Sequence, residues 1–263
     1  GGKLIIYLGN KNNGDLFESE LSGDKWGKPQ DFGKNINTDK FHESSASYSL
    51  DGKAVYFVSD KPGGFGDRDI YVSYRDEKNR WGKAENLGAI VNTEFGEEGV
   101  FMHPDGKTLY FIRAIRSREG RSNSDIYVSQ LQNNGQWSEA IRLSNTINSS
   151  QNEESVQIHP DGKTLYFASR GHLGMGGSDL FVSRMDKNGN WSKAENLGYP
   201  INTHFNENSL MVSAKGEVAY LASNRPGGYG DLDIYYFNLP DEIKPTKTFY
   251  FDGLVFDLKT RKA

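Results

Sequence analysis

Apolar residues occur along the chain in short runs separated by turn residues. In one stretch, residues 155–158 alternate between polar and apolar side chains, and residues 164–168 form a run of branched and aromatic residues after a Pro-Asp-Gly turn. A glycine loop at residues 171–177 leads to a third run at 179–183, and a weaker fourth run ends near Leu197. No segment shows the period of a helix, so the pattern predicts short strands in groups of four.

This four-run unit recurs with a period of 54 to 56 residues. The period is kept by four tryptophans: Trp26, Trp81, Trp137 and Trp191. It is also kept by an Asp-(Ile/Leu)-(Tyr/Phe) motif that begins at Asp15, Asp69, Asp125, Asp179 and Asp233. Regular repetition of four short strands predicts an all-β fold, a β-propeller of four-stranded antiparallel blades. The markers predict five blades, or six if residues upstream of Gly1 supply another.

The predicted propeller covers residues 1–240, and the chain after it changes character. Residues 241–248 are polar and bounded by prolines, which is typical of a linker. Residues 249–263 are expected to begin a β-sandwich domain or to supply a closing strand.

The order of strands places the connections on two opposite faces. If the strands of a blade are named A to D, the A–B and C–D turns share one face, the turn face. The B–C loops and the D-to-A crossovers share the other face, the loop face. Loops on a rigid scaffold usually carry binding, so the loop face is the expected functional surface.

The repeated motifs resemble those of a known family. Residues 160–169, Pro-Asp-Gly-Lys-Thr-Leu-Tyr-Phe-Ala-Ser, and the later Asp-Leu-Phe-Val-Ser at 179–183 resemble the TolB-like, WD-repeat-like propeller. The Arg-Pro-Gly-Gly-Tyr-Gly segment at 225–230 is similar to the form found in OmpA-family periplasmic proteins. Residues 251–260 resemble the opening hairpin of a carboxypeptidase-regulatory-like domain.

This domain order is similar to PorE-type components of the type IX secretion system. The resemblance implies a periplasmic scaffold associated with the outer membrane or the cell wall, with a protein partner in the periplasm or outer membrane. Contact with peptidoglycan would come only through a domain outside this sequence.

Each crossover carries an Asn-(Thr/Ser) pair followed by an acidic or amide residue. We paired these crossovers with Glu43, Glu98, Glu154 and, in the last crossover, Asn208. One interpretation is a ring of carboxylates, Glu43, Glu98 and Glu154, that holds a cation or a basic segment of a partner. The favoured alternative is structural: the polar side chains satisfy backbone groups of the crossover and contact the neighbouring blade.

The other repeated residues favour structural roles. The five motif aspartates suggest calcium ligation where a second aspartate stands two residues earlier, as at Asp67 and Asp231. Hairpin capping explains all five copies and is preferred. The tryptophans could stack on sugar rings, but their fixed place after a turn favours a packing role.

One loop departs from the repeat and is the main candidate for partner binding. Residues 113–121 carry Arg113, Arg116, Arg118 and Arg121 where other blades carry glycines. This loop is predicted to dock an acidic protein or an anionic glycan, although a merely solvated loop explains it equally well. His172 on the loop face is a further candidate contact.

Composition excludes several classes of function. The net charge is −4 and no basic run occurs, so nucleic acid is not an expected partner. Cysteine is absent, which excludes disulfides and thiolate metal sites. The longest apolar run, residues 4–8, is far shorter than the roughly 20 residues of a membrane helix, so no transmembrane segment is predicted. Neither a cofactor nor a metal is predicted.

These features favour a non-enzymatic protein-binding scaffold. No Gly-x-Ser-x-Gly nucleophile motif occurs, and no carboxylate is distinguished from its copies in the other repeats. The alternative is a propeller that binds or cleaves a glycan with carboxylates of the loop face.

Overall fold

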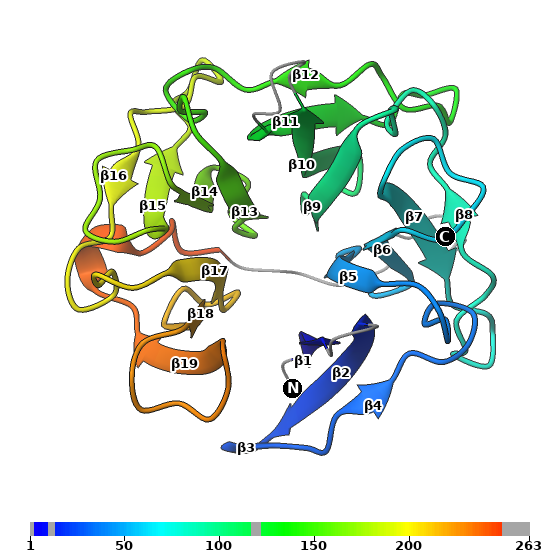
Figure 1. Ribbon diagram of the computed structural model, residues 1–263, viewed down its shortest axis with the longest axis horizontal. Helices are drawn as coiled ribbons and strands as arrows, with labels where there is room; N and C mark the ends of the chain where they lie inside the picture. The colour runs from blue at the N-terminus through cyan, green and yellow to red at the C-terminus, as the bar shows by residue number, and fades with distance from the viewer. Residues whose placement is uncertain (1–2, 10–13, 117–121, 249–263) are drawn as a thin grey trace, which may run out of the picture.

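Antiparallel strands form five sheets around a central axis (Figure 1). The computed structural model describes residues 3–9, 14–116 and 122–248. The predicted all-β propeller with five blades is confirmed, and the described residues form no sixth blade.

Three blades fill all four strand positions, from A at the axis to D at the rim. Blade 2 contains β5 (Glu43–Tyr48), β6 (Ala54–Ser59), β7 (Asp69–Tyr74) and β8 (Glu85–Asn86). Blade 3 contains β9 (Gly96–Met102), β10 (Thr108–Arg116), β11 (Ser122–Gln130) and β12 (Ile141–Arg142). Blade 4 contains β13 (Glu153–Ile158), β14 (Thr164–Ser169), β15 (Asp179–Arg184) and β16 (Glu195–Asn196).

The first and last blades are incomplete within the described residues. Blade 1 contains β1 (Lys3–Gly9), β2 (Gly14–Ser22), β3 (Lys25–Trp26) and β4 (Gln30–Asp31). Because β3 and β4 both pair with β2, these strands fill positions B, C and D. Blade 5 contains β17 (Glu207–Val212), β18 (Val218–Ser223) and β19 (Asp233–Asn238), which fill positions A, B and C. A short 3₁₀ helix, Asp241–Ile243, follows β19, and no helix in the described part of the chain could cross a membrane.

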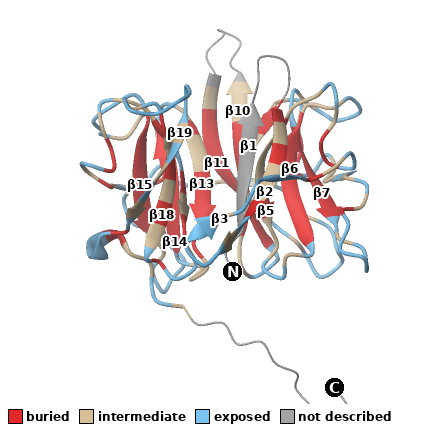
Figure 2. Ribbon diagram, turned by 90° about the horizontal axis from the view of Figure 1, so that it is seen from below, coloured by how far each residue is buried: buried red, intermediate tan, exposed pale blue. Residues whose placement is uncertain are grey.

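The hydrophobic core is divided into seams between neighbouring blades. Figure 2 shows buried residues along the strands, between two exposed rims. At the seam between blades 4 and 5, for example, Leu180 and Val182 of β15 pack with Leu210 of β17 and Leu221 of β18. Each blade therefore depends on the next one to bury its outward-facing apolar side chains, which explains why single repeats cannot fold alone.

A tryptophan of one blade packs against a tyrosine of the previous blade. The edge of Trp137 meets Tyr56, with ring centroids 6.3 Å apart, and Trp191 meets Tyr110 at 6.4 Å. The ring closes with the same contact, because Trp26 of blade 1 meets Tyr220 of blade 5 at 5.7 Å.

The corresponding tyrosine of blade 4, Tyr166, has a different partner. Its hydroxyl donates to the backbone oxygen of Ile243 (2.6 Å), and Ile243 is buried in the same core cluster. The 3₁₀ helix after β19 thus occupies the place that a tryptophan of a fifth D strand would take. The chain then continues along the turn face, where the Thr246 N–H donates to Asp161 (2.8 Å).

An asparagine in each crossover fastens adjacent segments together. Asn202 accepts from the Leu180 N–H and donates to the Leu180 oxygen, both at 2.8 Å. The same two bonds join Asn37 to Leu16, Asn92 to Ile70, and Asn148 to Ile126. These bonds satisfy the backbone at the start of strand C, where the D strand does not reach.

Candidate functional site

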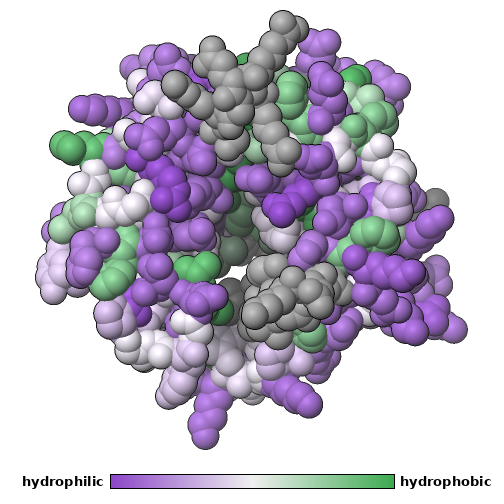
Figure 3. Space-filling model, in the orientation of Figure 1, coloured by the Kyte–Doolittle hydropathy of each residue, from purple (hydrophilic) through white to green (hydrophobic). Residues whose placement is uncertain are grey.

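Two hollows meet at the centre of the loop face. One follows the channel between the inner strands of blades 2 to 5 and has a volume of about 390 Å³. The other has a volume of about 660 Å³ and lies between the B–C loop of blade 2 and the start of blade 3. Arg68 and Glu98 line both, so the two hollows are neighbours. Figure 3 looks onto this face and shows the central opening with hydrophilic residues around it.

A β-bulge in each A strand shapes the channel lining. The pairing of strands A and B shifts by one residue between Ser44 and Ala46 in blade 2, and between Glu153 and Ser155 in blade 4. Blades 3 and 5 carry the same irregularity. A bulge re-aims the extra side chain, and such bulges are frequent next to functional sites.

In each of the four described A strands, one residue lies directly after a buried glutamate and lines the channel. These residues are Ser44, Glu98, Glu154 and Asn208. All four line the channel hollow, but only blades 3 and 4 supply a carboxylate. The channel therefore lacks the symmetry of the strands around it, with two acidic residues on adjacent blades and neutral polar residues on the others.

The two channel carboxylates have different surroundings. Glu98 is half-exposed and lies 3.7 Å from the Arg68 guanidinium. Glu154 is more enclosed and accepts a short hydrogen bond from Nε of Arg170. The second oxygen of Glu154 is buried without a hydrogen-bond partner among the described residues. The pair thus combines one enclosed carboxylate fixed by arginine with one that solvent reaches more easily.

The wider hollow is also rich in carboxylates. Its lining includes Asp60, Asp67, Glu94 and Glu98, with Arg68 as its one basic side chain among the described residues. Phe95 supplies a half-buried aromatic ring to the same lining. Sequence analysis did not single out Arg68, Glu94 and Phe95, because the repeat pattern does not show which loop residues line a hollow.

The expected ring of Glu43, Glu98 and Glu154 is not formed, because Glu43 belongs to a different set. Its counterparts are the fully buried Glu97, Glu153 and Glu207. Each accepts the backbone N–H of the crossover threonine or serine, as Glu43 does from Thr38 (2.9 Å). The first crossover is one residue longer than the others, which shifted the sequence alignment by one position.

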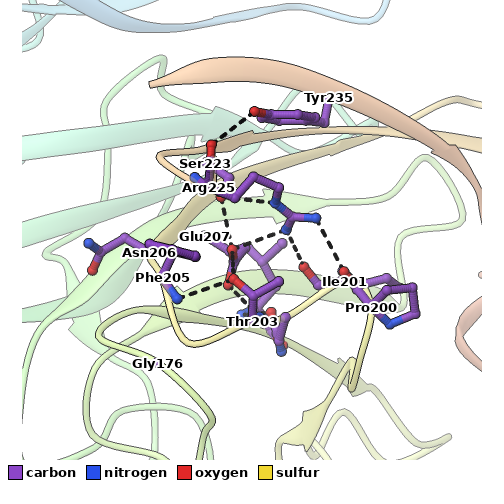
Figure 4. A network of polar contacts seen from close by, with 12 residues as sticks. Gly176, Pro200, Ile201, Thr203, Phe205, Asn206, Glu207, Ser223, Arg225 and Tyr235 are labelled. Atoms are coloured by element: carbon purple, nitrogen blue, oxygen red, sulfur yellow. Dashed lines mark hydrogen bonds and ion pairs between the residues drawn. The ribbon is translucent and has the colours of Figure 1, made fainter. Parts of the chain in front are cut away.

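A cation stabilises most of these buried glutamates. Arg225 lies 3.0 Å from Glu207 and over the ring of Tyr235, as Figure 4 shows for the surrounding network. In blade 3, Arg113 lies 2.8 Å from Glu97. In blade 2, Lys61 lies over the Tyr71 ring and its charge acts on Glu43.

Glu153 of blade 4 has no ion-pair partner among the described residues, although the charge of Arg142 in blade 3 acts on it. In blade 4, His172 lies beside the rings of Phe167 and Phe181. Its ring centroid is 5.8 Å from that of Phe167 and 5.2 Å from that of Phe181. One oxygen of Glu153 is buried without a partner among the described residues. Burial, with a smaller contribution from the nearby charge of Asp125, raises the pKa of Glu153 to about 7.

The structure describes only part of the predicted arginine-rich docking loop, and its binding role stays a prediction. Arg113 is buried against Glu97, donates to the Val91 oxygen (2.8 Å), and is not available to a partner. Arg116 ends β10, while Arg118 and Arg121 lie outside the described residues. His172 points inward, with Nε2 2.6 Å from the Ile147 oxygen.

Four of the five motif aspartates hold backbone groups or an arginine. Asp179 accepts the N–H groups of Met175 and Gly176, and Asp69 and Asp233 receive similar bonds from their own B–C loops. Asp125 pairs with Arg142 at 2.7 Å instead. In the parts of the chain that are described, no group of three or more acidic or histidine side chains is arranged to hold a metal.

Comparisons with solved structures support the fold. An α-L-arabinofuranosidase from Podospora anserina, in complex with cellotriose, matches with a TM-score of 0.56 and 11% identity over 90% of this chain and 86% of that one. An α-L-arabinanase from Penicillium chrysogenum, complexed with arabinobiose, matches with a TM-score of 0.51 and 12% identity over 90% and 71%. The tricorn protease matches with a TM-score of 0.46 and 12% identity over 86% of this chain, which spans only 23% of that protein.

No family model matches the sequence, and no curated protein matches it. The chain spans less than two thirds of several of the structures it matches, including 62% of a Bacteroides uniformis protein and 32% of a prolyl endopeptidase.

These likenesses correct the expectation that the chain is not an enzyme. That expectation rests on the even repetition of the strands, which offers no asymmetry for a catalytic site. Two matched structures with TM-scores above 0.5, the arabinofuranosidase and the arabinanase, are glycosidases on this fold. The regular spacing belongs to the residues that build the blades, and it says nothing against chemistry in the unsymmetrical channel.

Proposed function

We propose that this protein binds a glycan at the centre of the loop face and cleaves a glycosidic bond there. The observation that carries the proposal is the pair Glu98 and Glu154, which line one channel hollow from adjacent blades. Glycoside hydrolysis uses two carboxyl groups on either side of the scissile bond. The fold shared with an arabinofuranosidase and an arabinanase supports this choice of substrate class.

The surroundings of the pair suggest how the roles are divided. Arg170 fixes the position of the Glu154 carboxylate, so this residue would activate a water molecule or attack the anomeric carbon. Glu98, which is more exposed and more loosely paired with Arg68, would protonate the leaving oxygen. Phe95 in the adjoining hollow offers an apolar face for a sugar ring, and the carboxylates around it can accept hydrogen bonds from hydroxyl groups.

Turnover by Glu98 and Glu154 variants tests the proposal. The wild-type protein is offered aryl arabinofuranosides, arabinan and peptidoglycan fragments, and release of reducing sugar is measured. Glu98→Gln and Glu154→Gln are each expected to lower the rate at least about 100-fold, since each removes acid–base chemistry. Glu85→Gln, at the exposed rim of blade 2, is the matched control and should keep the wild-type rate.

Calorimetric titration with the same glycans separates binding from cleavage. Saturable binding without turnover would reject hydrolysis while keeping the glycan site. If the protein neither binds nor cleaves any glycan of the panel, the proposed function is rejected altogether.

We also propose that the protein acts in the periplasm, associated with the outer membrane or peptidoglycan. The repeated TolB-like motifs, and their similarity to OmpA-family proteins such as PorE-type components of type IX secretion, support this location. A protein partner of the periplasm or outer membrane would fit the same setting. Fractionation of cells followed by immunodetection tests the location, and recovery of the protein from the cytoplasm alone would contradict it.

A further inference from the structure

Strand β19 of blade 5 exposes the apolar side chains that other C strands bury. Ile234 is 54% exposed and Tyr236 is 75% exposed. Their counterparts in blade 4, Leu180 and Val182, are each 0% exposed. The sequence of β19 follows the repeat, so the difference lies in what covers the strand.

In the other blades, the cover is the segment that runs from strand D into the crossover. After blade 2, Leu87 donates its N–H to the Ile70 oxygen, Asn92 bonds both backbone groups of Ile70, and Val91 is fully buried in the seam. The four copies of this segment share the pattern (Leu/Phe)-(Gly/Ser)-x-x-(Ile/Val)-Asn-(Thr/Ser). No such segment covers β19 within the described residues.

A groove marks the uncovered seam between blades 5 and 1. It has a volume of about 290 Å³, and its lining is almost wholly apolar: Trp26, Pro29, Tyr220, Ile234 and Tyr236 among others. Exposed aromatic and aliphatic side chains next to an unpaired strand edge are typical of sites where an extended peptide adds as a further strand.

We propose that this seam binds a peptide segment of a partner protein that carries the crossover pattern Leu-Gly-x-x-(Ile/Val)-Asn-Thr. The asparagine pairs with the backbone of Ile234, and the leucine and the isoleucine or valine cover Ile234 and Tyr236. The four copies within the chain show which sequence fits this surface, since the same surface recurs in each blade.

Two other occupants fit the seam less well: the chain's own segment after β19 and a second copy of the protein. The chain after β19 is fastened to blade 4 through Ile243 and Thr246, and it runs along the turn face. The copies of the pattern inside the ring are already seated in their own seams, so a second molecule has none to offer without unfolding a blade. A separate peptide has neither constraint.

Binding of a synthetic peptide tests the proposal. The peptide has the sequence of residues 83–94, Lys-Ala-Glu-Asn-Leu-Gly-Ala-Ile-Val-Asn-Thr-Glu, with a fluorophore at its N-terminus. Fluorescence anisotropy is expected to show saturable one-to-one binding to the intact protein. Alanine in place of the peptide asparagine that corresponds to Asn92 should weaken binding at least about 10-fold, because two backbone hydrogen bonds are lost.

Variants of the protein locate the binding surface. Ile234→Asp should weaken binding at least about 10-fold, while Tyr229→Asp, at a fully exposed position in the preceding loop, should not change it. Both sites are exposed, so both variants should keep wild-type stability. This is checked by thermal unfolding. Tyr236→Asp provides a second variant if Ile234→Asp fails to fold.

Several results would overturn the proposal. These are absence of saturable binding, binding that Ile234→Asp and Tyr236→Asp leave unchanged, and binding that is indifferent to the asparagine. Self-association abolished by Ile234→Asp would assign the seam to a second copy. Binding that appears only after removal of residues 249–263 would assign it to the chain's own C-terminal segment. None of these results bears on glycan cleavage in the channel.

Discussion

Replacement of Asn202 with alanine is expected to lower the free energy of unfolding by roughly 3 kcal/mol or more. Asn202 is 0% exposed and makes three side-chain hydrogen bonds, two to the backbone of Leu180 and one to Asn196. Alanine would leave the Leu180 N–H buried without a partner, and each such group costs about 1–3 kcal/mol. Equilibrium unfolding in urea measures the change.

Asn190→Ala serves as the control for this experiment. Asn190 lies in an exposed turn and its side chain makes only a 3.4 Å contact with Asp186, so its loss should change stability by less than about 0.5 kcal/mol. Equal effects of the two substitutions would show that the crossover asparagines do not hold the blades together.

The second large effect is expected at two equivalent glutamates that respond in opposite directions. At pH 8, Glu153→Gln should stabilise the protein by about 1–3 kcal/mol, because it removes a buried charge that has no ion-pair partner among the described residues. Glu207→Gln should destabilise it by roughly 3 kcal/mol, since it leaves Arg225 without its buried partner. Urea unfolding of both variants at one pH makes the comparison.

The stabilisation produced by Glu153→Gln should depend on pH. Its pKa is about 7 in the folded protein, against 4.5 for an ordinary glutamate. The folded state therefore keeps a proton that the unfolded state loses, and this stabilisation is full below about pH 4.5 and lost as the pH rises through 7. The difference between Glu153→Gln and wild type should grow between pH 5 and pH 8. A constant difference, or a loss at pH 8, would contradict the assignment.

Much of the fold could be predicted because the sequence can be compared with itself. The spacing of the tryptophans and of the Asp-Ile-Tyr motifs was enough to predict five blades. Turn residues also located the strands: the expected strand at residues 164–168 is β14, Thr164–Ser169. Each of these signals is local, and repetition removes most of the ambiguity that a single copy would carry.

The site was predicted less well because it depends on single-residue register. Glu43 and Glu98 stand at similar places after their Asn-Thr pairs, yet one is buried in the crossover and the other lines the channel. Whether a glutamate is buried or lines the channel depends on the extra residue in the first crossover and on the bulges in the A strands. A pattern of residue types shows neither feature. The inward position of Arg113 depends on Glu97 and on two aromatic rings, contacts that no local motif reveals.

The buried contact and hydrogen bond between Ile243 and Tyr166 have a mechanical consequence. Tension on the chain beyond Thr248 would reach blade 4 before blade 5, because the 3₁₀ helix is fastened there by a buried side chain and a hydrogen bond. The short connection from β19 to this helix would carry no tension. Pulling from that end would therefore put no load on the junction between blades 5 and 1 until the contact between Ile243 and Tyr166 broke.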